Sequence, residues 1–430
     1  MKTKTIIRKQ ILFWSMAILM IIGSCTQAPV TLVPDSIAEV KLLKSTNGPV
    51  RSGLEVFLES VSGADSLKYG LLTNQTCVNR NLVHGVELLP AKIDLQLILS
   101  PEHGLFGAEN AGDNVENETD PETGIKSLST YRKKPAGIAE MISDLDVVLF
   151  DIQDIGVRSY TYISSMAYLM QAAAIAGKKV IILDRPNPIN GIQMEGNILD
   201  PEFTSFVGIY PLPYRHGMTI GELALLFNAE YGINCDLQVV AMEGWTRSMW
   251  YEDTGLPWVP TSPHVPDAST ILPMIATGTY GELGMLSEGV GTTIPFEYTG
   301  GPWIKDPHAF ARAMQARAGE GVIYRPTFFK PYYGRHKGEV CGGLQLYVTD
   351  RDLFSPYLVG LVLMSVHQEL YPEINLFENE NRFDMFAKVM GTDDIRVAIQ
   401  QGADPKVLEH NWEKELLRFG ELRKKYLLYD

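Results

Sequence analysis

The sequence predicts an α/β protein: an open parallel sheet with helices between its strands, followed by a smaller α+β domain. Short apolar runs, typical of strands buried on both faces, alternate with helical segments between residues 68 and 241. Strands separated by helices of this length form parallel sheets with right-handed crossovers. The alternation stops near Trp245, and residues 252–273 are rich in Pro, Thr and Ser. We therefore predict two domains, over residues 66–270 and 271–430.

The N-terminus predicts a lipoprotein signal peptide over residues 1–25. A basic start is followed by an apolar stretch, residues 11–22, that is too short to span a bilayer. Ile22-Gly23-Ser24-Cys25 then resembles a bacterial lipobox with Cys25 as the lipidated residue. A plain secretory signal is the alternative. Residues 26–65 are predicted to form a tether, with short helices near residues 40–43 and 53–60.

This segment predicts a cell-envelope protein, anchored by lipid to a bacterial membrane and facing the periplasm or the surface. The whole chain of 430 residues has a formal charge of −14, which argues against nucleic acid as a partner. An anionic glycan would need local arginines. The remaining cysteines, Cys77, Cys235 and Cys341, have no metal-ligand spacing and predict neither a zinc site nor a disulfide framework.

The helices and strands of the first domain are predicted from its apolar runs and from the Gly, Pro and capping residues that end them. The predicted strands cover residues 69–72, 93–99, 146–150, 180–183 and 237–241. The predicted helices cover residues 84–89, 136–145, 160–176 and a segment that starts after Thr219. Gly177 suits the C-cap of the long helix, and Thr219 with Glu222 forms a capping box. A long acidic loop over residues 108–127 is typical of a functional segment or a lid.

The second domain is expected to begin with Gly-rich turns between residues 277 and 301. A strand is predicted over residues 344–349, and helices over 356–370 and 412–425. Ser287 to Phe296 places the carboxylate of Glu288 between flexible glycines, which suits a loop that closes over a ligand. A surface β-turn is the alternative.

Glu102 and His103 follow the second predicted strand, in Ser100-Pro101-Glu102-His103-Gly104-Leu105-Phe106-Gly107. Pro101 ends the strand because it has no N–H for the ladder, and the two glycines allow a tight turn. The carboxyl ends of parallel strands are where open α/β sheets bind ligands. A carboxyl group beside an imidazole can supply an acid, a base or a metal ligand.

Similar polar clusters follow other strands or precede helices in the first domain. They are Asp151/Asp154/Arg158, Asp184/Arg185/Asn187 and Arg215/His216. Several such clusters at one sheet edge predict a single polar cleft. No G-x-G-x-x-G, P-loop or G-x-S-x-G motif is found, so neither a nucleotide cofactor nor a serine nucleophile is predicted. His103 and His216 could hold a metal with Asp154 or Asp184, but their spacing gives little support.

These motifs, in this order, resemble those of the exo-β-N-acetylmuramidase family, formerly a domain of unknown function. The segments that carry the resemblance are residues 71–76, 100–107, 151–162, 184–188 with Gly191, Glu195 and Gly196, 215–223, and 287–296. The resemblance implies a Rossmann-like doubly wound N-terminal domain and a smaller C-terminal domain. It also implies release of terminal N-acetylmuramic acid from the non-reducing end of peptidoglycan fragments, without a cofactor. Met285 and Val290 stand where the family pattern has Asn and Arg, which leaves the exact glycan open.

Glycoside hydrolysis needs a proton for the leaving oxygen and stabilisation of an oxocarbenium-like centre. Glu102 is our candidate acid, because a carboxyl group in a closed cleft can remain protonated. Asp154 is the first candidate for the second carboxylate, ahead of Asp151, Asp184 and Glu288, and the substrate's own acetamido oxygen is an alternative nucleophile. The sugar carries an anionic lactyl group, which an arginine would bind, and Arg158, Arg185 and Arg215 are the candidates. The residues expected to bind substrate are His103, Asp151, Arg158, Tyr162, Asp184, Arg185, Asn187, Arg215, His216 and Glu288.

Two other functions remain open from the residues alone. The protein could be a lipid-anchored glycan-binding protein without turnover, or a metal-dependent amidase or deacetylase. Release of sugar from a muraminide distinguishes a glycosidase from a glycan-binding protein. Loss of activity with a chelator distinguishes a metal-dependent amidase or deacetylase from a metal-free glycosidase.

Overall fold

The computed structural model describes residues 50–61 and 66–430. The predicted signal peptide, Cys25 and the helix expected near residues 40–43 lie outside this described part of the chain. In the first half its elements are α2 (Gly53–Ser60), β1 (Lys68–Thr73), α3 (Gly85–Leu88), η1 (Leu89–Ala91), β2 (Asp94–Ser100), β3 (Glu118–Thr119), β4 (Lys126–Ser129), α4 (Pro135–Met141), β5 (Val147–Asp151), α5 (Tyr162–Ala176), β6 (Lys179–Leu183), β7 (Glu195–Ile198), η2 (Pro201–Phe203), β8 (Pro213–Arg215), α6 (Ile220–Glu230) and β9 (Asp236–Val240).

The second half begins with the short helices η3 and η4. Its elements are η3 (Tyr251–Thr254), η4 (Ala268–Thr270), α7 (Ile271–Gly281), β10 (Tyr298–Gly301), α8 (Pro307–Ala318), β11 (Val322–Phe329), β12 (Cys341–Val348), α9 (Pro356–Leu370), η5 (Glu380–Arg382), α10 (Phe383–Met390), α11 (Asp394–Gln400) and α12 (Pro405–Arg423).

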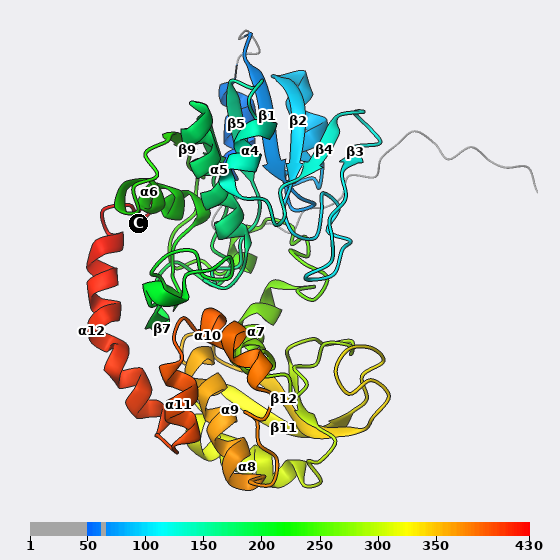
Figure 1. Cartoon of the computed structure of the whole chain (residues 1–430), viewed down its shortest axis with the longest axis vertical. Coiled ribbons are helices and arrows are strands. Elements are labelled where there is room, and N and C mark those ends of the chain that lie inside the picture. The colour runs from blue at the N-terminus through cyan, green and yellow to red at the C-terminus, as the bar shows by residue number, and fades with distance from the viewer. Residues whose placement is uncertain (1–49, 62–65) are drawn as a thin grey trace, which may run out of the picture. The chain divides into compact units, whose positions relative to one another are not determined.

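Within the described residues, a sheet in the order β3-β4-β2-β1-β5-β6-β9 organises the first half (Figure 1). Its neighbouring strands are parallel except for β3 and β4. The chain places β2 and β4 on one side of β1, and β5, β6 and β9 on the other. This reversal between β1 and β5 is the switch point at which doubly wound sheets form a crevice. The predicted doubly wound α/β fold is confirmed.

Helices cover both faces of this sheet, as the continuous apolar strands require. α4, α5 and α6 pack on one face, in a core that contains Phe150 and Ile182. α2 and α3 pack on the other face, against Leu71 and Leu149. The predicted C-cap of α5 is confirmed, because Gly177 has a φ of 65°.

The predicted tether is too long at its C-terminal end. α2 lies where a helix was expected, but Leu54 and Phe57 are buried in the core of the first half. A Cβ on Gly53 would collide with the backbone nitrogen of Asp184, so glycine allows this helix to approach the end of β6 closely. Residues 50–60 therefore belong to the folded first half. The predicted domain boundary near residue 270 stays a prediction.

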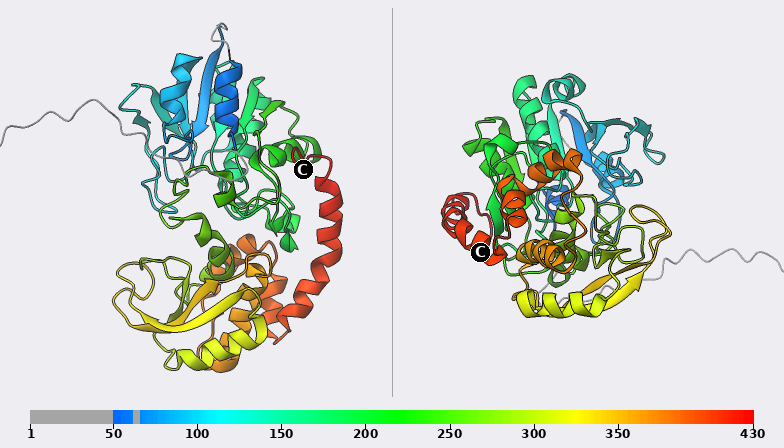
Figure 2. Two further views of the ribbon diagram at one scale, coloured as in Figure 1. Left: turned by 180° about the vertical axis from the view of Figure 1, so that it is seen from behind. Right: turned by 60° about the horizontal axis from the view of Figure 1, so that its bottom comes forward.

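The second half packs helices on an antiparallel sheet in the order β10-β12-β11. α9 covers the predicted residues 356–370, whereas the turns expected from residue 277 begin later because α7 continues to Gly281. α12 is longer than predicted. It leaves the second half and ends beside α6, as Figures 1 and 2 show, where Tyr426 hydrogen-bonds Glu230.

Candidate active site

The strand ends predicted to share one edge of the sheet do lie together. Thr73, the last residue of β1, is in register with Asp151, the last residue of β5. The Thr73 hydroxyl donates to the Asp151 carbonyl at 2.8 Å. The N–H of Gln153 donates to Thr76 Oγ1 at 2.9 Å, which joins the two loops at the switch point.

Glu102 is buried at the end of β2, and three donors contact its carboxyl group. Gly112 N–H and the Tyr131 hydroxyl lie 3.1 and 2.9 Å from Oε1. The Thr161 hydroxyl lies 2.8 Å from Oε2. These contacts come from the acidic loop, the segment after β4 and the start of α5. The carboxyl group is therefore held in one orientation from three sides.

His103 lies beside Glu102 in an uncommon backbone conformation. Its φ is 72°, and the adjacent Gly104 also has a positive φ, of 79°. Non-glycine residues rarely adopt this conformation, and such strain is concentrated at functional sites. His103 Nδ1 contacts the carbonyl of Glu109 at 2.7 Å. The predicted tight turn is present. Through the contact of His103 with Glu109, the acidic loop lies against the segment that contains Glu102.

Asp154 and His216 form a buried pair in which each side chain leaves one polar atom unused. Asp154 Oδ2 accepts the N–H of Gly156 at 2.7 Å. His216 Nδ1 accepts the N–H of Met218 at 3.2 Å, which leaves the proton on Nε2. His216 Nε2 lies 3.7 Å from Asp154 Oδ2, too far for a hydrogen bond. The pair can therefore offer a donor and an acceptor to a ligand.

In the described part of the chain, two buried amide side chains also carry a polar atom without a hydrogen-bond partner. Asn74, after β1, and Gln153, after β5, are buried, and sequence reasoning assigned neither a role. Among the described residues, no hydrogen-bond partner reaches the buried atoms Asn74 Nδ2, Gln153 Oε1, Asp154 Oδ1 and His216 Nε2. Native proteins leave few buried polar atoms unpaired. Four of them at one switch point indicate a site for a polar ligand. We call these four residues the polar floor.

The three arginines expected to bind an anionic group are instead used by the fold. Arg185 pairs with Asp151, and Arg215 Nη1 lies 2.6 Å from Glu195. Arg158 is fully buried and donates to the backbone carbonyls of Asn197, Leu212, Val389 and Met390. The sequence shows that these residues follow strands, but not that acceptors surround them. The geometry favours structural roles for all three.

Three other expected substrate-binding residues are also engaged within the protein. Tyr162 donates to the carbonyl of Thr261, and Asn187 donates to the carbonyl of Met218. Asp184 accepts four hydrogen bonds, from Arg185 N, Gly221 N, Thr219 Oγ1 and Tyr429 Oη. Burial raises the pKa of Asp184 to about 7, although these donors oppose the shift.

Glu288 lies in the second half, where Arg335 Nη1 contacts its Oε2 at 2.6 Å. Burial raises the pKa of Glu288, and the charge of Arg335 opposes that effect. Sequence reasoning missed Arg335, which is 47 residues away. It also missed Tyr131 and Arg132. Arg132 is exposed and donates to the carbonyl of Gly112, whose N–H contacts Glu102.

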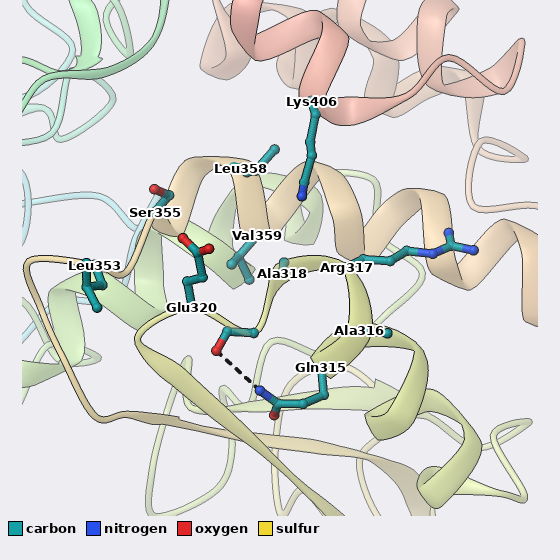
Figure 3. A pocket seen from close by; sticks show the side chains of 11 residues that line it. Gln315, Ala316, Arg317, Ala318, Glu320, Leu353, Ser355, Leu358, Val359 and Lys406 are labelled. Carbon is teal, nitrogen blue, oxygen red and sulfur yellow. Dashed lines mark hydrogen bonds between the residues drawn. The ribbon is translucent and has the colours of Figure 1, made fainter.

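A hollow elsewhere in the second half contains none of these residues. It lies between the C-terminus of α8 and the starts of α9 and α12, and its lining includes Glu320, Ser355 and Lys406 (Figure 3). Gln315 closes one side by donating to the carbonyl of Gly319 at 3.2 Å. The chemistry predicted from the strand ends therefore lies elsewhere.

In residues 50–61 and 66–430, no three His, Cys, Asp or Glu side chains are grouped so that they could hold a metal ion. Nor is any helix here both long and apolar enough to cross a membrane.

Comparisons with solved structures support the same architecture. A DUF1343 family protein of Bacteroides fragilis NCTC 9343 superimposes with a TM-score of 0.81 at 37% identity, covering 89% of this chain and 99% of that one. A second DUF1343 family protein from the same organism gives a TM-score of 0.69 at 28% identity, with the same coverage.

Sequence comparisons match both halves of the chain. The N-terminal domain of exo-β-N-acetylmuramidase NamZ matches residues 69–269, and its C-terminal domain matches residues 275–429. The peptidoglycan β-N-acetylmuramidase NamZ of Bacillus subtilis (strain 168) is 41% identical over 414 residues, which is 96% of this chain and 97% of that protein. The resemblance found in the sequence is confirmed: this chain belongs to the exo-β-N-acetylmuramidase NamZ family.

Proposed function

We propose that this protein is a glycoside hydrolase that releases terminal N-acetylmuramic acid from the non-reducing end of peptidoglycan fragments, with Glu102 as general acid. The observation that carries the proposal is the 41% identity, along nearly the whole chain, to a peptidoglycan β-N-acetylmuramidase. The buried carboxyl group of Glu102, at the carboxyl end of β2 next to β1, supports the assignment of the acid.

The polar floor supports a subsite for the terminal sugar. A buried Nδ2 donor on Asn74 suits an acetamido carbonyl, and the Oε1 acceptor of Gln153 suits a hydroxyl or an amide N–H. Asp154 Oδ1 is the unpaired carboxylate atom that would face positive charge developing on the ring, or orient the acetamido group. Glu102 would then donate its proton to the leaving oxygen.

The lactyl carboxylate of the substrate requires a cationic side chain whose donors are not all bonded to acceptors within the protein. Arg132 supports this role better than the three buried arginines, because it is exposed and reaches Glu102 through Gly112. The neighbouring Lys133 and Lys134 are also exposed. They would attract an anionic fragment toward a protein whose overall charge is negative.

Replacement of the acid tests the mechanism. Glu102→Gln keeps the shape of the side chain but removes the transferable proton, so kcat on a natural muropeptide should fall about 10²–10⁴-fold while KM changes little. The loss should be smaller on a nitrophenyl muraminide, whose leaving group needs less protonation. Steady-state kinetics on both substrates measure this.

The matched control is Glu116→Gln, a change to an exposed carboxylate in the same acidic loop. It should leave both rates near the wild type. Near wild-type turnover of muropeptide by Glu102→Gln would eliminate Glu102 as the acid, and Glu288 would be the next carboxyl group to replace. Sugar binding without turnover by the wild type would instead indicate a glycan-binding protein.

We also propose that Cys25 is lipidated and holds the enzyme at a membrane of the cell envelope. The support is in the sequence, where a basic start and a short apolar stretch lead directly to Ile22-Gly23-Ser24-Cys25.

A further inference from the structure

The loop between β11 and β12 carries two exposed aromatic rings, for which the sequence predicted no role. Tyr332 is 60% exposed and Tyr333 39%. Their ring centroids lie 5.3 Å apart, at an interplanar angle of 56°. Large aromatic side chains left side by side in water are unusual away from binding surfaces.

Hydrogen bonds from the rest of the second half hold this loop in place. Tyr332 N–H donates to the carbonyl of Gly291 at 2.8 Å, and the N–H of Gly338 closes the loop onto Pro331 at 2.8 Å. Arg335 contacts Glu288, and His336 Nε2 contacts the carbonyl of Met285 at 2.7 Å. The two rings therefore stand on a fixed support and lose little freedom on binding a ligand.

His264 connects the loop to the segment between η3 and η4. Its Nε2 lies 2.7 Å from Tyr333 Oη, and the two rings stack with centroids 6.0 Å apart. Burial lowers the pKa of His264.

A path of contacts through the start of α5 leads from this same segment to Glu102. Tyr160 donates to Thr261 Oγ1 at 2.8 Å, and the adjacent Thr161 donates to Glu102. Thr261 precedes His264 by three residues. Residues 261–264 therefore link Tyr333 to the start of α5, whose Thr161 contacts Glu102. Phe106, which is 52% exposed, lies on the turn that carries Glu102.

Burial distinguishes two ends of this site. The polar floor is buried, whereas the tyrosines are exposed. An enzyme that removes a terminal sugar encloses that sugar, and the rest of the glycan must extend into solvent. Exposed rings at this site would therefore meet the part of the substrate beyond the cleaved bond. A pyranose ring has an apolar C–H face that is removed from water when it lies on an aromatic ring.

We propose that Tyr332 and Tyr333, here called the tyrosine platform, stack the N-acetylated sugar that becomes the leaving group. The proposal rests on the proposed function, because it uses the same bond and the same acid. It makes Tyr332 and Tyr333 specificity-determining residues that act on substrate binding rather than on proton transfer.

The test compares two substrates that differ only in the leaving group. One is the disaccharide N-acetylmuramyl-N-acetylglucosamine, and the other is methyl N-acetyl-β-muraminide, whose leaving group has no ring. The double variant Tyr332→Ala/Tyr333→Ala should lose about 10-fold in kcat/KM on the disaccharide, mainly through KM. On the methyl glycoside its kcat/KM should stay within about twofold of the wild type. Tyr333→Phe keeps the ring and should retain most of the activity on the disaccharide.

Phe328→Ala is the matched control, because Phe328 is 59% exposed in the same half but lies on β11. It should change neither rate. Equal losses on both substrates, or no loss on the disaccharide, would overturn the platform and leave the proposed function standing. Absence of turnover of both substrates by the wild type would overturn the proposed function, and the platform with it.

Discussion

At the scale of single residues, Asp184 shows how a strand-end carboxylate can serve the architecture instead of the chemistry. The sequence places it after β6, in the position typical of a ligand-binding acid. In the structure it caps the start of α6 through Gly221 and accepts the hydroxyl of Tyr429, which is 245 residues away. That second partner could not be predicted from local sequence, because no local pattern reports a contact across the whole chain.

The raised pKa of Asp184 predicts a specific pH dependence of stability. Its pKa rises from 3.8 to about 7 on folding, so the folded state holds a proton that the unfolded state releases between these values. The stabilisation that this proton gives the folded state is fully present below about pH 4 and is lost by about pH 7. The free energy of unfolding should therefore fall by up to about 4 kcal/mol over this range. Asp184→Asn should remove this dependence. Urea unfolding of both proteins between pH 4 and 8 measures the difference.

The control is Asp144→Asn, because Asp144 is exposed on the turn after α4. Its pH profile should run parallel to that of the wild type. A parallel profile for Asp184→Asn would contradict the expected linkage.

The catalytic candidates illustrate what residue types can and cannot predict. Glu102 was predictable because a proline, a carboxylate and two glycines after a buried strand indicate a turn that presents polar groups at a functional edge. Asn74 and Gln153 occupy the same edge, but amides there are equally typical of turns. Only the absence of a partner in the described structure distinguishes them, and this absence is a three-dimensional property.

At the scale of elements, Arg158 joins the β7–β8 hairpin to α10. Nη1 donates to the carbonyls of Asn197 and Leu212, and Nη2 lies 2.8 Å from the carbonyl of Met390. The guanidinium also lies over the ring of Tyr214, with 5.4 Å between its central carbon and the ring centroid. Its planar fork suits several acceptors at once, which a lysine ammonium cannot reproduce.

Arg158→Lys should therefore destabilise the protein without weakening substrate binding. Lost hydrogen bonds to a charged group cost about 1.5–3 kcal/mol each, so we expect the free energy of unfolding to fall by roughly 3 kcal/mol. KM of the folded variant should stay near the wild type. Urea unfolding and steady-state kinetics on one preparation separate the two effects.

Arg312→Lys, at an exposed position on α8, should change neither quantity. Wild-type stability combined with a KM raised several-fold would restore the substrate-binding role that the sequence predicted for Arg158.

Most elements could be predicted wherever a long periodic pattern was available. α9 and the central strands follow directly from apolar runs and their flanking Pro or Gly residues. β3 lies inside the segment interpreted as an acidic loop, and β4 starts at the end of that segment, so the pairing of β4 with β3 and with β2 left no local signal. α2 has a capping box of Ser52 and Glu55, but its burial depends on a close backbone approach to β6 that sequence spacing does not encode.

At the scale of the whole molecule, the anchor proposed at Cys25 is tested in cells. Cys25→Ala should move the protein from the membrane fraction to the soluble fraction, because the acyl chains that hold it would be absent. Immunoblots of fractionated cells measure the distribution. Cys77→Ala, a change to a buried cysteine of the folded part, should leave the fractionation unchanged. Membrane association that persists in Cys25→Ala would contradict lipid anchoring.

The C-terminal residues return to the first half after α12. Tyr429 contacts Asp184, Leu428 N–H donates to Glu222 at 2.9 Å, and the N–H of Arg247 donates to the carbonyl of Asp430 at 2.9 Å. The first half can therefore complete these contacts only after residues 428–430 have been synthesised, far later than its own sheet. Removal of residues 428–430 would leave the buried carboxyl group of Asp184 without its hydrogen bond from Tyr429.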